Sequence, residues 1–247
     1  MREYRKHKYI SPYFHAQARG EIGRKKRDEI YPIYKAKEYP RFVEHTLGPG
    51  IEVNCSLTGG LVERRTRREF ESTEALLLSD IETLLSSGLK IQNGEEISED
   101  VEPKRPYPSG GSRNPLECYV WVLREKDIPS GLYYYNPIRH SLITLLEGNQ
   151  LLSRDRILTY SFSKDAPVLF FFTAKWERTL LKYGDLGYAF AHLECGHASQ
   201  NLLLLAEALK LSACPLAGFR FKETCELLGI DGIDEAPIHA IAFGKRL

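Results

Sequence analysis

The chain has 247 residues, with 34 Lys and Arg against 33 Asp and Glu, and 43% of its residues are hydrophobic. This length suits one large domain or one domain with an appendage, and the hydrophobic share excludes global disorder. A net charge of +1 argues against a surface that coats nucleic acid, and no apolar run reaches the roughly 20 residues that span a bilayer. The five cysteines are scattered and never form CxxC, which is typical of a reduced, cytoplasmic protein without a disulfide framework.

The near-zero net charge conceals an uneven distribution. Residues 1–45 contain 12 Lys and Arg against 6 Asp and Glu, a local net charge of +6, together with six of the fourteen tyrosines. A solvated arm, a segment wrapping a dimer, and a contact surface for an acidic leader peptide or partner protein all agree with this composition.

The first predicted element is a helix over residues 73–86. Leucines and an isoleucine recur there at helical spacing, with Ser72 as a plausible N-cap and Gly88 as a stop. Residues 92–115 are rich in proline and glycine and contain an acidic stretch, so they predict a long loop.

The middle of the chain predicts a series of strands. Residues 117–123 alternate and are rich in β-formers, and residues 132–135 and 141–146 predict two further strands joined by a turn at Asn136 and Pro137.

The last part of the chain predicts alternating helices and strands. A helix is expected over residues 150–159, and the continuous apolar run 167–174 predicts a buried central strand. Residues 186–211 form the longest helical pattern, apolar on most of its circumference and therefore buried in a core or a subunit interface. Residues 237–243 predict a final strand. Because the order lacks regular βαβ alternation, we expect an α+β fold with helices layered on a sheet.

Residues 64–68, RRTRR, are the first candidate site. Consecutive arginines with a hydroxyl can form a fork-shaped site for a phosphate. A solvated run of charges is the alternative, and a nucleic-acid patch is disfavoured because acidic residues flank the run.

Residues 106–115, PYPSGGSRNP, are the second candidate. Adjacent glycines let a backbone approach a ligand closely, and Ser109, Ser112 and Arg113 add hydrogen-bond donors. The segment matches neither a P-loop nor GxGxxG, and an ordinary long loop is the alternative.

Lys182 and Tyr183, ahead of a glycine turn, are the third candidate. A lysine whose pKa is lowered by burial can act as a general base, and the alternative is a surface lysine lying on a tyrosine ring.

The small-residue segment 214–219, CPLAGF, can lie flat against a planar ligand or end the preceding helix. The histidines are dispersed without HxxxH or HExxH, so no metal site is expected.

The order of these motifs is more specific than any one of them. RRTRREF, RPYPSGGSRNPLECYVWV, GLYYYNPIRHSL, KYGDLGYAFAHLECGHASQNLLLLAEALKLSACPLAGF and IAFGKR together resemble the SagB-type, or thiazoline/oxazoline dehydrogenase, branch of the nitroreductase-like flavoproteins. Residues 1–55 resemble the variable basic, Tyr-rich N-terminal extension of that branch, and residues 56–247 its FMN-binding domain. The resemblance implies a three-layer α/β/α sandwich with a mixed sheet, in an intertwined homodimer that binds FMN at the subunit interface.

The family's cofactor contacts can be carried over to matching positions. There, the arginine cluster holds the FMN phosphate and ribityl chain, the PSGG loop contacts flavin across the dimer, CPLAGF runs beside the isoalloxazine, and terminal basic residues close over the phosphate. The resemblance therefore implies FMN contacts by Arg64, Arg65, Thr66, Arg68, Pro108, Ser109, Gly110, Ser112, Leu216, Ala217, Gly218, Lys245 and Arg246.

The resemblance also implies an activity. In the azoline-oxidising branch the Lys-Tyr pair is catalytic, which falls on Lys182 and Tyr183, and the substrate is a ribosomally made peptide delivered alongside a cyclodehydratase. Aromatising an azoline ring removes a hydride and a proton, so a base is needed beside the flavin. The alternatives are an NAD(P)H-dependent reductase of nitro, quinone or enone compounds on the same scaffold, and a non-catalytic partner-binding subunit.

Overall fold

A seven-stranded sheet forms the centre of the computed structural model, which describes residues 34–71, 73–98, 101–124, 126–148 and 153–247. The strand order is β1-β4-β3-β2-β5-β7-β6. The strands are β1 (Glu44–Thr46), β2 (Leu116–Val122), β3 (Gly131–Asn136), β4 (Ser141–Glu147), β5 (Val168–Lys175), β6 (Leu211–Leu216) and β7 (Glu235–Lys245).

Every pairing among the described strands is antiparallel, so the expectation of a mixed sheet is wrong. A parallel pair needs a crossover that returns the chain to the edge where the first strand began. Here each connection between paired strands leads the chain back in the opposite direction. The turn at Asn136 joins β3 to β4 as predicted. The Asn136 Oδ1 accepts hydrogen bonds from the backbone N–H groups of Ile138 (3.0 Å) and Arg139 (3.1 Å).

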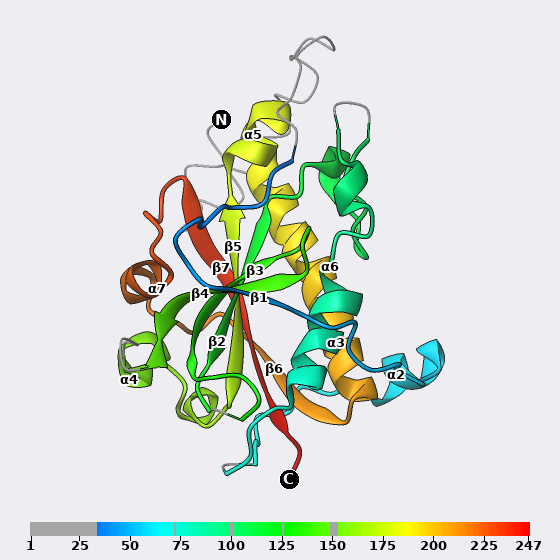
Figure 1. The fold of residues 1–247 in the computed structure, drawn as a ribbon, viewed down its shortest axis with the longest axis vertical. Coiled ribbons are helices and arrows are strands. Elements are labelled where there is room, and N and C mark those ends of the chain that lie inside the picture. The colour runs from blue at the N-terminus through cyan, green and yellow to red at the C-terminus, as the bar shows by residue number, and fades with distance from the viewer. Residues whose placement is uncertain (1–33, 72, 99–100, 125, 149–152) are drawn as a thin grey trace, which may run out of the picture.

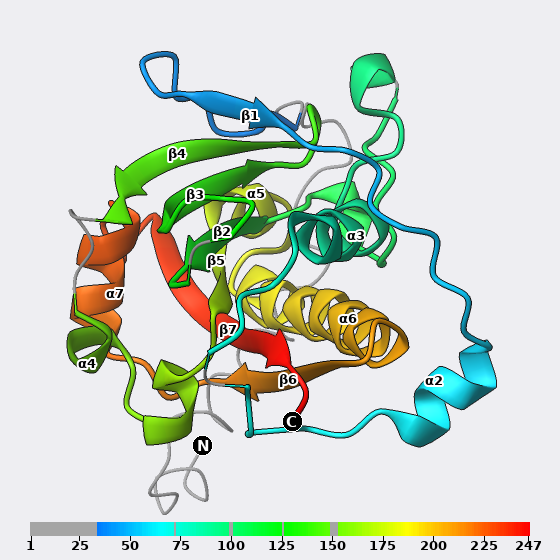
Figure 2. The same cartoon turned by 60° about the horizontal axis from the view of Figure 1, so that its bottom comes forward.

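Helices cover both faces of the sheet, which confirms the three-layer sandwich (Figures 1 and 2). In Figure 2, α3 and α6 lie on one face, and α4 and α7 on the other. The helices are α2 (Leu57–Glu63), α3 (Leu78–Gly88), α4 (Arg154–Ile157), α5 (Glu177–Tyr183), α6 (Leu186–Ala208) and α7 (Phe221–Leu228), with 3-10 turns η2 (Gly94–Glu96), η3 (Gly110–Ser112) and η5 (Ser161–Lys164).

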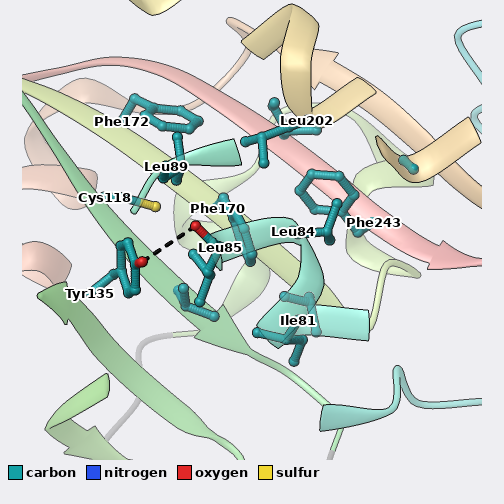
Figure 3. Packing of buried hydrophobic residues seen from close by; sticks show 14 of the residues in the cluster. Ile81, Leu84, Leu85, Leu89, Cys118, Tyr135, Phe170, Phe172, Leu202 and Phe243 are labelled. Atoms are coloured by element: carbon teal, nitrogen blue, oxygen red, sulfur yellow. Dashed lines mark hydrogen bonds between the residues drawn. The ribbon is translucent and has the colours of Figure 1, made fainter. Parts of the chain in front are cut away.

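The apolar run of β5 is buried on both sides, as predicted. Phe170 and Phe172 pack into the cluster beneath α3 and α6 (Figure 3), whereas Leu169 and Phe171 pack into the cluster beneath α4 and α7. Because successive strand side chains alternate between faces, only a strand covered on both sides can carry so continuous an apolar run.

Two predicted helices are shorter in the structure than in the prediction. α3 ends at Gly88 as expected but begins only at Leu78, where the Asp80 carboxylate accepts a hydrogen bond from the Leu77 backbone N–H at 3.3 Å. The predicted cap Ser72 lies outside the described residues. The expected helix 150–159 is reduced to the four residues of α4, after which Leu158 leaves the helix for a β-bridge with Phe219; residues 149–152 are also outside the described part.

The long helix ends earlier than its apolar pattern predicts. α6 stops at Ala208, Lys210 takes a positive φ of 57°, and the chain enters β6 at Leu211. The first half of the CPLAGF segment, residues 214–216, thus lies in an edge strand, a position at which Pro215 is tolerated because one side of the strand has no partner. At its end Leu216 is buried and Ala217 is exposed.

Residues 34–47 of the expected N-terminal extension reach this sheet, whereas Gly48 and Ile51 bond to Glu82 and Thr83 of α3. β1 pairs with β4, and Tyr34 and Leu47 are buried. No helix in the described part of the chain is long and apolar enough to cross a membrane.

Candidate functional site

The arginine-rich segment leaves the end of α2 with much of its charge uncompensated. Arg65 donates only to two backbone carbonyls, at 2.6 and 2.9 Å, and the Arg68 guanidinium lies 5.8 Å from the centre of the Phe162 ring. Within the described residues, Arg64, Arg65 and Arg68 form no ion pair, and Thr66 is half-buried among them. Three guanidinium groups beside a hydroxyl make a surface suited to an anion.

Arg246, near the C-terminal end of the chain, is linked to the arginine-rich segment through Glu207 of α6. The Glu207 carboxylate lies 2.6 Å from Arg246 and 3.5 Å from Arg67, whose buried Nε has no hydrogen-bond partner among the described residues. Lys245 pairs with Asp80 at 2.7 Å. Residues 64–68 and 245–246 therefore meet in space, but Lys245 and Arg246 are each engaged by a carboxylate that the sequence did not reveal.

Gly218 is connected to the same cluster by aromatic packing. Its carbonyl accepts hydrogen bonds from the Thr159 backbone N–H (3.1 Å) and hydroxyl (2.7 Å), and a Cβ at this position would collide with the Tyr160 ring. Tyr160 stacks on Phe162 at 5.5 Å, the ring over which Arg68 lies. Close packing against Tyr160 therefore explains the glycine in CPLAGF without a ligand.

Lys182 and Tyr183 lie directly against the glycine-rich loop. Gly111 has a φ of 55°, and a Cβ there would collide with the Tyr183 hydroxyl and lie 2.5 Å from Lys182 Nζ. The Tyr183 ring also packs edge-on against Phe190 at 4.8 Å, and Phe190 lies 3.3 Å from a Cβ built on Gly110. Two motifs that are far apart in the sequence thus form one compact site.

The rest of this loop borders a buried carboxyl group. Pro108 is exposed and Ser112 is half-buried with a φ of 52°, while the Ser109 hydroxyl accepts a hydrogen bond from the Asn114 N–H at 2.9 Å. Glu194 of α6 is 2% exposed, and neither carboxylate oxygen has a partner of standard geometry in the described part of the chain.

Burial raises the pKa of Glu194 to about 7. The neighbouring Ser109 hydroxyl and the charges of Arg105 and Arg178 oppose this shift without cancelling it. Removing a carboxylate from water disfavours its charged form, so Glu194 holds a proton over much of the range near neutrality. The sequence offered one signal for Glu194 and Glu207: they are the two acidic residues of the otherwise largely apolar helix α6.

The predicted cofactor residues fall into two groups at opposite ends of α6 (Figure 1). The glycine loop lies beside Glu194, and the arginine cluster lies beside Glu207. Glu194 and Glu207 are thirteen positions apart, which corresponds to about 20 Å along the helix. A single chain therefore does not bring all the predicted FMN contacts together.

Two of the buried cysteines, Cys195 and Cys214, are poor candidates for thiolate chemistry. Burial raises the pKa of Cys195 to about 12 and also raises that of Cys214, as predicted from their apolar surroundings. Cys55 is exposed, unlike the other four. Among the described residues, no group of three or more His, Cys, Asp or Glu side chains could hold a metal.

The sequence profile of the Nitroreductase family matches residues 61–245, and the chain belongs to that family, whose members are flavin-dependent oxidoreductases. A nitroreductase-like protein of Methanocaldococcus jannaschii, MJ1384, is 31% identical over 202 residues, covering 81% of this chain and 95% of the relative. The microcin B17-processing protein McbC of Escherichia coli is 29% identical over 153 residues, covering 57% of this chain and 54% of McbC.

Solved structures share the fold. A nitroreductase-like protein of Anabaena variabilis superposes with a TM-score of 0.71 at 23% identity, covering 95% of this chain, which spans only 47% of that longer chain. A chain of the E. coli microcin synthetase McbBCD complex, determined with truncated pro-MccB17 bound, superposes with a TM-score of 0.62 at 21% identity, covering 96% of this chain and 92% of that one.

Proposed function

We propose that this protein is an FMN-dependent dehydrogenase of the SagB type, which oxidises thiazoline or oxazoline rings to azoles in a ribosomally synthesised peptide. The observation that carries the proposal is the contact of Lys182 and Tyr183 with the glycine loop at Gly111. This contact sets a proton-accepting pair against the loop to which the resemblance assigns flavin contacts. Similarity to McbC supports the peptide substrate.

The donor set fits FMN. Arg64, Arg65 and Arg68 have no acidic partner in the described part of the chain, and the buried Nε of Arg67 lacks an acceptor. A dianionic phosphate would satisfy such groups, and each charge-assisted hydrogen bond contributes about 1.5–3 kcal/mol. Leu216, Ala217 and Gly218 would border the ring system.

When bound, FMN supplies the acceptor for the hydride that leaves the azoline ring. The chain's own residues have the remaining tasks. Lys182 and Tyr183 take and position the proton that leaves the neighbouring ring carbon, and the Gly111 turn, which has no side chain, leaves room for both groups beside the substrate.

The proposed site requires a homodimer. The α6 face near Leu193, which is 60% exposed, and the α2 face near Leu57, which is 73% exposed, present apolar side chains without cover in this chain. A cavity of about 340 Å³ lies between α2 and α6, lined by Leu57 and Leu204 among others. A second copy packed antiparallel on α6 would place its glycine loop beside the first copy's arginine cluster, completing the set.

A charge introduced on the α6 face at Leu193 tests whether this face forms the proposed dimer. We expect Leu193→Glu to weaken self-association by about 100-fold, or about 2.7 kcal/mol, because a carboxylate would be buried without a partner. Sedimentation velocity measures the change, and flavin content should fall with it. Ile233→Glu, at another exposed apolar residue, is the control that should stay dimeric. A wild-type chain that is monomeric with flavin bound would refute the shared site.

The peptide and a cyclodehydratase are the proposed partners. A cyclodehydratase makes the azoline that this reaction consumes, so the two activities belong to one sequence of modifications. The structural similarity to a chain of McbBCD, a synthetase complex that was determined with a pro-peptide, supports assembly of this kind.

A direct test uses the purified protein. Its visible spectrum reports bound flavin, and incubation with a synthetic thiazoline peptide should remove two hydrogen atoms per ring, detected by mass spectrometry. A colourless protein that does not take up added FMN would contradict the proposal.

An NAD(P)H-dependent reductase of nitro, quinone or enone compounds is the second candidate, favoured by the similarity to MJ1384 over nearly its whole length. This candidate predicts NAD(P)H oxidation with such compounds and no change in the peptide.

A further inference from the structure

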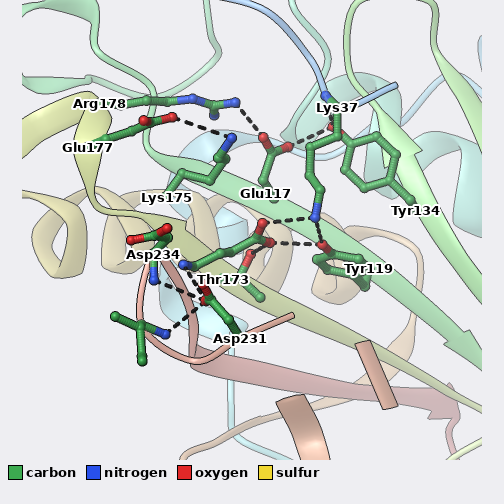
Figure 4. Close-up of polar contacts among 12 residues, drawn as sticks. Lys37, Glu117, Tyr119, Tyr134, Thr173, Lys175, Glu177, Arg178, Asp231 and Asp234 are labelled. Carbon is green, nitrogen blue, oxygen red and sulfur yellow. Dashed lines mark hydrogen bonds and ion pairs between the residues drawn. The ribbon is translucent and has the colours of Figure 1, made fainter. Parts of the chain in front are cut away.

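A buried polar network lies where the sheet meets α5 (Figure 4). Two carboxylates on different strands each meet a cation: Glu117 of β2 lies 2.6 Å from Arg178, and Glu235 of β7 lies 2.8 Å from Lys37. Glu117 also accepts a hydrogen bond from the Tyr134 hydroxyl at 2.7 Å. The network is therefore well satisfied, which is the condition under which buried charges are tolerated.

Arg178 joins three separate segments of the chain to α5. Besides its pair with Glu117, its guanidinium donates to the Asn114 carbonyl of the glycine loop and to the Lys35 carbonyl of the N-terminal segment, both at 2.9 Å. The guanidinium also lies 4.7 Å from the centre of the Tyr34 ring. Only a planar fork with several donors can make these contacts together.

Arg178 is well placed to act on the proposed catalytic pair. It precedes Lys182 by four residues, so both side chains lie on the same face of α5. Both also reach the same loop, Arg178 at Asn114 and Lys182 at Gly111. The helix and the loop are therefore linked at two points. At one of them is the Arg178 side chain, which is only 12% exposed and bonds to Glu117, Asn114 and Lys35.

We infer that Arg178 is a positioning residue, which holds α5 against the glycine loop so that Lys182 and Tyr183 keep their places beside the reacting ring. The inference rests on the proposed function for the role of the pair. The segment of Tyr34 and Lys35 helps to hold Arg178 in place, because the Tyr34 ring and the Lys35 carbonyl both contact its guanidinium group.

The test is Arg178→Lys in the full-length protein. Lysine keeps a positive charge beside Glu117, so the fold is retained, but it cannot reach both carbonyls. We expect kcat for a thiazoline peptide to fall about 10- to 100-fold, because small misplacements of reacting groups have effects of this size. KM and the affinity for FMN should change much less than kcat, because Arg178 does not contact the arginine cluster that is proposed to hold the FMN phosphate.

A second readout is independent of activity. Hydrogen–deuterium exchange of the protein without added FMN should rise about tenfold in residues 177–183 and 110–114, and remain unchanged in α4 and the sheet. Arg154→Lys is the matched control, because Arg154 also donates to two backbone carbonyls, at 2.5 and 3.3 Å, but lies beneath the opposite face. It should leave kcat and exchange in α5 unchanged.

The outcomes separate the two proposals. Unchanged kcat and unchanged exchange in α5 for Arg178→Lys would overturn the inference, as would a rise in exchange spread evenly over the chain. If the wild-type protein does not oxidise the ring, the proposed function fails, whereas increased exchange confined to α5 and the loop would still support Arg178 as the residue that holds them.

Discussion

Replacing Lys182 by methionine is expected to lower the rate of azoline oxidation by about 10²- to 10⁴-fold, the range typical for loss of a general base. Methionine keeps the apolar stem against the glycine loop but cannot accept a proton. Single-turnover reduction of bound flavin by a thiazoline peptide, followed by absorbance, measures the chemical step directly. The flavin content of the variant should equal that of the wild type, because Lys182 is not among the residues proposed to hold FMN, and the methionine stem still packs at Gly111.

Lys175→Met serves as the matched control for this experiment. Lys175 lies at the end of β5 near α5, where it pairs with Glu177 at 3.5 Å, and it has no role in the proposed chemistry. Its replacement should leave turnover unchanged. An active Lys182→Met enzyme would contradict the assignment of the base to Lys182, and comparison with Tyr183→Phe would then show whether the tyrosine has that role. Unaltered nitro-compound reduction in both variants would favour the reductase alternative.

Replacing Glu194 by glutamine is expected to stabilise the protein, and to do so increasingly as the pH rises. Burial raises the pKa of Glu194 to about 7 from an ordinary value of 4.5. The unfolded chain releases this proton near pH 4.5, whereas the folded chain keeps it up to about pH 7. The folded state is therefore penalised as the pH rises through this interval, and the penalty reaches roughly 3 kcal/mol above pH 7.

Urea unfolding of the two proteins at pH 5 and pH 8 measures this difference. The gain in unfolding free energy for Glu194→Gln should be small at pH 5 and largest at pH 8, because glutamine carries no charge at either pH. Glu226→Gln, at an exposed position of α7, should show little dependence on pH. The same gain at both pH values would show that Glu194 does not titrate in this interval.

The central strands could be predicted closely from the sequence. β2, β3, β4 and β5 each differ by at most one residue at either end from the predicted ranges, because their burial imposes a local apolar pattern and the Asn136 turn is encoded in its own side chain. The short helices α2, α5 and α7 were not predicted, since seven or eight residues hold too little periodicity to stand out.

The candidate site likewise contains parts that the sequence predicted and parts that it did not. The arginine run, the glycine loop and the Lys-Tyr pair were identified in the sequence as motifs, because each is contiguous. Glu207, which joins Arg67 to Arg246, could not be placed without the fold, and neither could Arg178, since an ion pair between distant residues leaves no local pattern.

The sequence by itself determined which segments are apolar enough to form the sheet and which contiguous motifs carry chemistry, because those properties reside in neighbouring residues. Only the tertiary structure decided that residues 211–216 form an edge strand, that every described pairing is antiparallel, and that the proposed cofactor contacts lie at opposite ends of α6. These features depend on contacts between residues far apart in the chain, whose free energies exceed local preference. The +1 net charge accordingly combines three arginines without acidic partners among the described residues, Arg64, Arg65 and Arg68, with carboxylates buried beside their own cations.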